Sequence, residues 1–328
     1  MGPAVAAWVL GAFAGLALLA AAIPAAAQPA QLPRVGAVYF AGPYDAVIDG
    51  LRAGLKELGL AEGRDFGLEV RDAKGEARTI EEIARRFERE GVRLIYSVPT
   101  AVTTVVKRVT THVPIVFCVG SDPISTGLIE SFARPGDRLT GVHYLSTDLT
   151  AKRLEVLKEL VPRLHRVVTF YDPANPVPRE AARQAREAGR QLGVELIERH
   201  VASAAELKAA LRALKPGEAD AFFLISDALV ISQSQAVIDA ARAIRLPTIF
   251  QEQTVAARGA LASYGVNFLE IGRQSARHVQ RVLGGTSPRD LPVENVTRIE
   301  LVLNRRTARE IGLAIPPGLL ARADRVIE

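Results

Sequence analysis

Short runs of β-branched and apolar residues alternate with longer stretches of helical periodicity along most of the chain. The first run, residues 34–40, is followed by a Gly-Pro turn and by residues 45–58, where apolar positions recur on one helical face. The alternation predicts further strands at residues 66–70, 92–97, 114–119, 166–171, 194–199, 220–225, 247–250, 259–264 and 297–303. It predicts further helices at residues 79–89, 100–110, 151–160, 178–192, 204–214, 229–244 and 267–283. This alternation is typical of parallel sheets built from right-handed βαβ units.

The alternation occurs in two blocks, each long enough to form its own sheet, with a predicted seam at residues 139–150. We therefore predict an α/β fold with two lobes, each a mostly parallel sheet flanked by helices. The first lobe is predicted to comprise residues 34–143 and a helix at about 267–292, and the second residues 144–266 and about 295–328. The predicted helix at residues 267–283 and the predicted strand at residues 297–303 do not continue the alternation of either block. We therefore expect the chain to cross back over the hinge there, so that one of them joins each lobe.

Residues 1–27 have the composition of an export signal. An uncharged apolar run, residues 4–23, ends at Pro24 and is followed by an Ala-x-Ala site at Ala25 and Ala27. No Lys or Arg precedes the run, and about 20 apolar residues also suffice to span a bilayer, so a retained anchor is the alternative. We predict a signal peptide cleaved after Ala27 and a periplasmic location for the rest of the chain.

Composition and motifs argue against several classes of protein. The formal net charge is +5, but Arg residues alternate with Glu and Asp along the predicted helices, as on a solvated helix face, so we predict no nucleic-acid partner. Cys118 is the single cysteine, which predicts neither a disulfide framework nor a lipoprotein. The five histidines lack metal-binding spacing, and the sequence contains no nucleophile elbow, Walker loop or dinucleotide-binding glycine motif. We predict no catalytic residues, no metal and no cofactor.

Three separated groups of residues carry a resemblance to a known family. The first group is Gly50-Leu51-Arg52, Gly54-Leu55, Leu58-Gly59 and Glu62-Gly63. The central group is Pro114-Ile115-Val116-Phe117, Ser121-Asp122-Pro123, Gly127-Leu128-Ile129, Arg134-Pro135-Gly136 and Thr140-Gly141-Val142. The third group is Asn304, Thr307-Ala308, Gly312, Ile315-Pro316-Pro317, Leu319-Leu320, Arg322-Ala323-Asp324 and Val326-Ile327-Glu328. In this order they resemble the ABC transporter substrate-binding proteins that include tryptophan- and tyrosine-type binders, over residues 34–328.

The resemblance implies a type I periplasmic-binding-protein-like fold, in which crossing strands join two α/β lobes and the ligand binds in the cleft between them. It implies that a small solute, amino-acid-like and aromatic or branched, is handed to an ABC permease in the inner membrane. We expect the protein to act as a monomer. The alternatives are a ligand sensor that docks on a membrane receptor and a periplasmic hydrolase.

Candidate ligand contacts lie in the turns after the strands, because ligands of open α/β sheets bind beyond the carboxyl ends of the strands. The helix that begins at Thr100 offers unpaired backbone N–H groups to a carboxylate, and Ser121 adds a hydroxyl. The predicted acceptors for an ammonium group are Asp122, Asp172 and Asp227. The rings predicted to flank an apolar side chain are Phe40, Tyr44 and Tyr171. The remaining predicted ligand contacts are Ala101, Asn175, Ser226 and Glu252.

Several of these residues have a simpler structural explanation. Asp before Pro is a common pair at the start of a helix, so Asp122 and Asp172 also fit the role of N-cap. Tyr44 also fits a packing role beneath the first helix, and Glu252 fits a solvated loop. His143, close to the seam, is interpreted as a hinge residue with a satisfied hydrogen bond.

Overall fold

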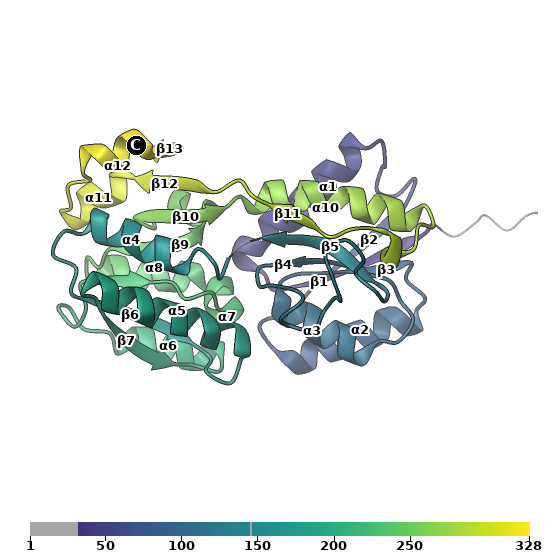
Figure 1. The fold of residues 1–328 in the computed structure, drawn as a ribbon, viewed down its shortest axis with the longest axis horizontal. Helices are drawn as coiled ribbons and strands as arrows, with labels where there is room; N and C mark the ends of the chain where they lie inside the picture. The colour runs from purple at the N-terminus through teal and green to yellow at the C-terminus, as the bar shows by residue number, and fades with distance from the viewer. Residues whose placement is uncertain (1–31, 145) are drawn as a thin grey trace, which may run out of the picture. The chain divides into compact units, whose positions relative to one another are not determined.

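The computed structural model describes residues 32–144 and 146–328, so the predicted signal peptide lies outside the described residues. Two mostly parallel sheets, each flanked by helices, confirm the predicted fold class (Figure 1). Among the described residues, no helix combines the length and the apolarity that a membrane span requires.

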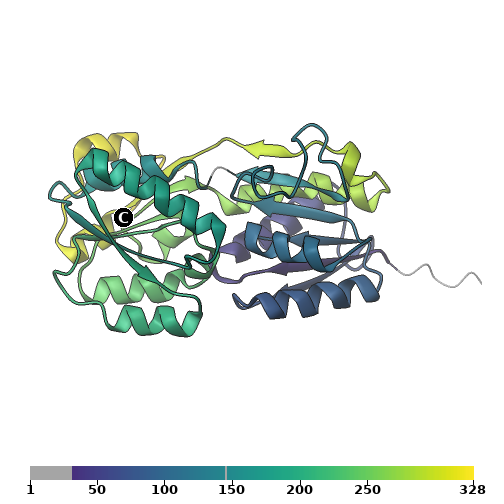
Figure 2. The ribbon, with the colours of Figure 1, turned by 60° about the horizontal axis from the view of Figure 1, so that its bottom comes forward.

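The first sheet has the strand order β11-β5-β4-β3-β1-β2, and all its neighbouring strands are parallel. Its strands are β1 (Arg34–Tyr39), β2 (Gly67–Asp72), β3 (Leu94–Ser97), β4 (Ile115–Val119), β5 (Leu139–Tyr144) and β11 (Glu294–Val296). The central strands β3 and β4 are buried along their whole length because helices cover both faces of the sheet. Helices α1 (Asp45–Glu57) and α10 (Phe268–Leu283) lie side by side on one face, and α2 (Ala77–Arg89) and α3 (Thr100–Val109) cover the other (Figures 1 and 2).

The second sheet has the strand order β13-β12-β10-β9-β8-β6-β7. Its strands are β6 (Arg166–Tyr171), β7 (Glu195–His200), β8 (Ala221–Phe223), β9 (Thr248–Glu252), β10 (Ala262–Val266), β12 (Glu300–Asn304) and β13 (Arg325–Ile327). Helices α4 (Thr150–Leu160) and α5 (Pro176–Leu192) cover one face, and α6 (Ala204–Arg212) and α8 (Ser234–Ala243) cover the other (Figure 2). The shorter helices are α7 (Ala228–Ser232), α9 (Thr254–Ala257), α11 (Arg305–Ile311) and α12 (Pro317–Arg322).

The chain passes between the two sheets three times: between β5 and α4, between β10 and α10, and between β11 and β12. We call the part built on the first sheet lobe 1 and the part built on the second sheet lobe 2. Strand β12 enters lobe 2 directly from β11, without a crossover helix, and it pairs antiparallel with β10.

Two predicted segments have a different structure, and the short elements α9, β11, α11, α12 and β13 were not predicted. Residues 139–144, interpreted from the sequence as a seam, form the fully buried strand β5. A Cβ at Gly141 would lie 2.1 Å from the carbonyl oxygen of Phe117, so this strand requires a glycine, which weakens its strand pattern in the sequence. The helix predicted at residues 229–244 is broken at Gln233 into α7 and α8.

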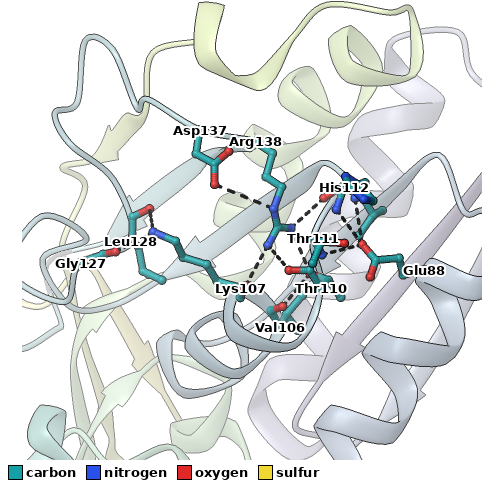
Figure 3. Close-up of polar contacts among 11 residues, drawn as sticks. Glu88, Val106, Lys107, Thr110, Thr111, His112, Gly127, Leu128, Asp137 and Arg138 are labelled. Atoms are coloured by element: carbon teal, nitrogen blue, oxygen red, sulfur yellow. Dashed lines mark hydrogen bonds and ion pairs between the residues drawn. The ribbon is translucent and has the colours of Figure 1, made fainter.

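Charged side chains fix the segment that follows α3 (Figure 3). The guanidinium of Arg138 donates to the backbone carbonyls of Lys107 at 2.9 Å, Thr110 at 2.7 Å and Val113 at 2.9 Å. Carbonyls at a helix C-terminus lack intrahelical partners, and a cation there is favourable. On the other side, one carboxylate oxygen of Glu88 accepts hydrogen bonds from the three N–H groups of residues 111–113. These contacts hold α3 in place, and the opposite end of α3 reaches the site described below.

We expect Glu88→Gln to lower the urea midpoint of unfolding at pH 7, with a difference from wild type that disappears toward pH 3. Burial opposes ionisation of Glu88, but the backbone donors and the nearby Arg138 outweigh it and hold the pKa of this carboxyl below its ordinary range. A group whose pKa is lowered on folding stabilises the protein above its unfolded pKa, and this contribution is lost as the pH falls through the folded pKa. Urea unfolding at several pH values tests this, with the exposed Glu82→Gln of the same helix as a control. A difference that persists unchanged at pH 3 would contradict a role for the charge.

Candidate ligand-binding site

Two adjoining cavities lie between lobe 1 and lobe 2. We call the smaller one the enclosed cavity and the larger one the outer cavity. The centre of a water molecule can occupy a volume of about 20 Å³ in the enclosed cavity and about 590 Å³ in the outer cavity. By this measure the enclosed cavity admits a group the size of one or two water molecules. The outer cavity falls in the size range of pockets that hold a whole small molecule.

Residues from both lobes line each cavity. The enclosed cavity is lined by Tyr44, Pro99, Thr100, Ala101, Gly120, Ser121, Tyr144, Asn175, Val177, Pro178, Ser226, Ala228 and Ile231, none of which carries a formal charge. The outer cavity is lined by Phe40, Gly75, Ala77, Ile80, Ala101, Thr104, Val105, Arg108, Ser125, Thr126, Asp172, Ala174, Asn175, Pro176, Val177, Ala202, Asp227, Ala228 and Leu229. No group of three metal-ligating side chains comes together in the described part of the chain.

The N-terminus of α3 forms one wall of the enclosed cavity. Pro99 precedes the helix, and no described side chain caps it, so its first N–H groups remain available to a ligand. The hydroxyl oxygen of Thr100 accepts hydrogen bonds from the N–H groups of Gly120 at 3.2 Å and Ser121 at 3.3 Å. Thr100 thereby ties the start of α3 to the turn after β4, and the helix dipole gives this wall a partial positive charge.

Two tyrosine rings form another wall. Tyr44 stacks on Phe268 with ring centroids 5.1 Å apart, and Tyr144 meets the same ring edge-on at 5.5 Å. Burial raises the pKa of both tyrosines well above the ordinary range, so their hydroxyls stay protonated and remain able to donate. The ring of Tyr144 lies against Gly120, where a Cβ would come within 2.6 Å of it. Tyr144 was not among the contacts predicted from the sequence, because it ends the strand that was interpreted as a seam.

Asp227 is a buried carboxylate at the edge of the outer cavity, with 1% of its surface exposed. Its oxygens accept hydrogen bonds from the N–H of Val230 at 3.1 Å, as the N-cap of α7, and from the N–H of Asp172 at 2.9 Å. No described basic side chain forms an ion pair with it. Burial raises the pKa of Asp227 to about 6, against the effect of these hydrogen bonds, so at pH 7 it carries a negative charge that the described residues leave unbalanced.

The structure brings nine of the twelve predicted contacts to the two cavities. Six line the enclosed cavity: Tyr44, Thr100, Ala101, Ser121, Asn175 and Ser226. The outer cavity is lined by Phe40, Asp172 and Asp227 and shares Ala101 and Asn175 with the enclosed one.

The other three predicted contacts, Asp122, Tyr171 and Glu252, line neither cavity. Asp122 is exposed and accepts a hydrogen bond from the N–H of Ile124 at 2.9 Å, which is a local turn contact. The Tyr171 hydroxyl donates to Glu198 of the neighbouring edge strand at 2.5 Å. Glu252 is buried and accepts from the N–H of Thr254 at 2.8 Å, and burial raises its pKa to about 7. A position at a strand end therefore does not decide where a side chain points.

Two residues of a buried polar cluster behind the enclosed cavity, Ser146 and Arg153, were not predicted from the sequence. The Ser146 hydroxyl lies 2.6 Å from the Ser226 hydroxyl and donates to the amide oxygen of Gln251 at 2.6 Å. Arg153 of α4 is fully buried beside it. The signal for Arg153 was its position four residues before Leu157, which places it on the apolar face of its helix.

Residues 40–327 match a family described as "ABC transporter substrate binding protein". The tyrosine-binding protein of Clostridioides difficile (strain R20291) is 25% identical over 270 residues, which cover 82% of this chain and 77% of that protein. A solved conserved domain protein of Vibrio cholerae superposes with a TM-score of 0.82 at 27% identity, covering 90% of this chain and 100% of that one. An ABC domain from Streptococcus pneumoniae in complex with L-Trp superposes with a TM-score of 0.80 at 20% identity, with the same coverage, and shares the fold.

Proposed function

Because the chain belongs to the ABC transporter substrate binding protein family, we propose that it captures an α-amino acid with a large apolar side chain for an importer. The observation that carries the proposal is the pairing of an uncapped helix N-terminus with a buried, unbalanced carboxylate, Asp227, at two adjoining cavities. Those two features match the two charges of an amino acid. The tyrosine-binding relative and the tryptophan-bound structure support an aromatic ligand.

The ligand's carboxylate occupies the enclosed cavity in this proposal. That cavity is small enough to select a single polar group, and it offers the first N–H groups of α3 as donors. The hydroxyls of Ser121 and Tyr44 add neutral donors elsewhere in the lining of the same cavity. A carboxylate is the group that this combination of hydrogen-bond donors and partial positive charge suits best.

The ammonium group and the side chain of the ligand occupy the outer cavity. Asp227 supplies the negative charge for the ammonium group, and a ligand cation relieves the cost of burying that carboxylate without a partner. Apolar contacts for the side chain come from Phe40, Ile80, Val105 and Leu229.

Ligand binding between the lobes favours the conformation in which both walls are in contact with it. Helix α7 of lobe 2 packs closely against lobe 1. A Cβ at Gly42 would lie 2.5 Å from the carbonyl oxygen of Ser232, and one at Gly75 would lie 3.0 Å from a methyl carbon of Leu229. In the proposed function, this joined surface of an exported, monomeric protein is presented to an ABC permease of the inner membrane.

A thermal-shift screen of residues 28–328 tests the function, since residues 32–328 form one compact unit. We expect L-tyrosine, L-tryptophan or a branched amino acid to raise the melting temperature by several degrees. A ligand at about a thousand times its Kd adds roughly 4 kcal/mol of stability. Small carboxylates, nucleosides and sugars serve as the comparison sets. A shift confined to sugars or nucleosides, in protein free of co-purified ligand, would contradict the amino-acid proposal.

A further inference from the structure

Arg153 is a fully buried arginine with no carboxylate partner among the described residues. Its Nε donates to the carbonyl of Tyr264 at 3.1 Å and its Nη2 to the carbonyl of Ser146 at 3.3 Å, while Nη1 has no partner in the described part of the chain. Burial lowers the pKa of Arg153 to about 9, so it stays positively charged at pH 7. A buried cation held only by carbonyl groups is costly unless a negative charge balances it.

Arg153 lies directly behind the wall of the enclosed cavity. Ser146, whose carbonyl it holds, also contacts Ser226 through its hydroxyl, and Ser226 lines the cavity. Gln251 completes this cluster. Rotation of its side-chain amide by about 180° places the NH₂ group, in place of the oxygen, next to the Ser146 hydroxyl. The Ser146 hydroxyl then donates to Ser226, and the Ser226 hydroxyl is free to donate toward the cavity, which is the direction that a bound anion requires.

We propose that Arg153 determines the specificity of this site, because its charge selects ligands that place an anionic group in the enclosed cavity. The described residues that line this cavity are neutral, so the charge of Arg153 behind them adds to the helix dipole of α3. A charge in a partly buried site is screened weakly and acts without direct contact. The inference rests on the proposed function, since it concerns the carboxylate end of the proposed ligand. Arg153 and Asp227 are thus buried charges of opposite sign without an ion-pair partner among the described residues, and an amino acid carries charges that complement them.

The test compares amino acids with their amides, which lack the negative charge. Binding of L-tyrosine, L-tyrosinamide, L-tryptophan and L-tryptophanamide is measured by calorimetry for the wild type, Arg153→Met, Arg153→Gln and Arg153→Lys. We expect the preference for acid over amide to fall about tenfold in the two neutral variants, the size expected for a charge acting across intervening groups. Arg153→Lys keeps the charge but not the planar fork that spans two carbonyls, so it should retain most of the preference.

A purely structural role for Arg153 predicts a different pattern. Loss of the hydrogen bonds from Arg153 to the carbonyls of Ser146 and Tyr264 would weaken the binding of acids and amides alike. Arg153→Lys would then lower the affinity as much as Arg153→Met. An acid-to-amide ratio that is unchanged in the neutral variants overturns the inference and leaves the proposed function standing. A wild type that binds none of the four compounds and no branched amino acid overturns the proposed function and this inference with it. Arg153→Gln retains an amide donor for the Ser146 carbonyl, so the test remains decisive if Arg153→Met does not fold.

Discussion

Replacing Asp227 by Asn is expected to weaken the binding of L-tyrosine or L-tryptophan about 100-fold while the protein stays folded. Asn is as good an N-cap as Asp, so the bond from the N–H of Val230 that begins α7 is kept. The substitution removes the charge that pairs with a ligand ammonium group, and the NH₂ group of the Asn replaces the oxygen that accepts from the N–H of Asp172, so that one backbone contact is also lost. Removing one partner of a buried charge pair costs about 2–5 kcal/mol, and a 100-fold loss of affinity lies at the lower end of that range.

Calorimetry with matched ligands and a matched control variant isolates this effect. Asp122→Asn changes a second aspartate at a strand end, but that residue is exposed and lines neither cavity, so its affinity should equal that of the wild type. A des-amino analogue, 3-(4-hydroxyphenyl)propionate, has no ammonium group and should bind Asp227→Asn at least as well as the wild type. Equal losses for tyrosine and for this analogue would assign the effect to the structure of α7.

The pH dependence of binding gives a second readout for Asp227. The pKa of its carboxyl is about 6 in the ligand-free protein, because burial disfavours the charged form. An ammonium group pairs with the ionised form, so the affinity should be constant from about pH 7 until the ligand's ammonium group deprotonates, and it should fall as the pH drops below about 6. This fall in affinity at low pH should be absent in Asp227→Asn.

Gly272→Ala is expected to destabilise the protein by about 3 kcal/mol or more. Helices α1 and α10 pack closely here, and a Cβ at Gly272 would lie 2.0 Å from the carbonyl oxygen of Val47 and 2.8 Å from the backbone nitrogen of Leu51. Both neighbours are backbone atoms, so the helices must separate. On α1, Gly50 has the same role toward α10, where a Cβ would lie 2.0 Å from the carbonyl oxygen of Leu269. Urea unfolding followed by circular dichroism measures the loss.

Gly318→Ala is the matched control for that substitution. Gly318 lies in α12, and no neighbouring atom lies within 4 Å of the position of its added Cβ. Alanine in a helix is about 0.5–1 kcal/mol more favourable than glycine, so this variant should gain stability by that amount. A Gly272→Ala protein as stable as the wild type would show that α1 and α10 can move apart without cost.

Local patterns in the sequence were sufficient to predict most of the secondary structure. Residues 45–58 show the reason, because their apolar positions follow the helical period and α1 buries that same stripe. Strand β5 was missed because its pattern contains Gly141, which the close contact with Phe117 demands. The break between α7 and α8 was missed because Gln233 is an ordinary helix residue, and the sequence around it contains no glycine or proline.

For the site, the sequence alone determined where strands end, and hence where Thr100, Ser121, Ser226 and Asp227 had to be sought. That much follows from a local alternation, because the carboxyl ends of parallel strands face the ligand side of a sheet. Only the tertiary structure decided which side chains reach the cavities: Tyr144 does and Tyr171 does not, and Asp227 is buried whereas Asp122 is exposed. It also decided that Arg153 is buried without a counter-charge. The physical reason is that burial and charge balance depend on segments far apart in the sequence, as when Ser146, Ser226 and Gln251 meet, and no local pattern records those encounters.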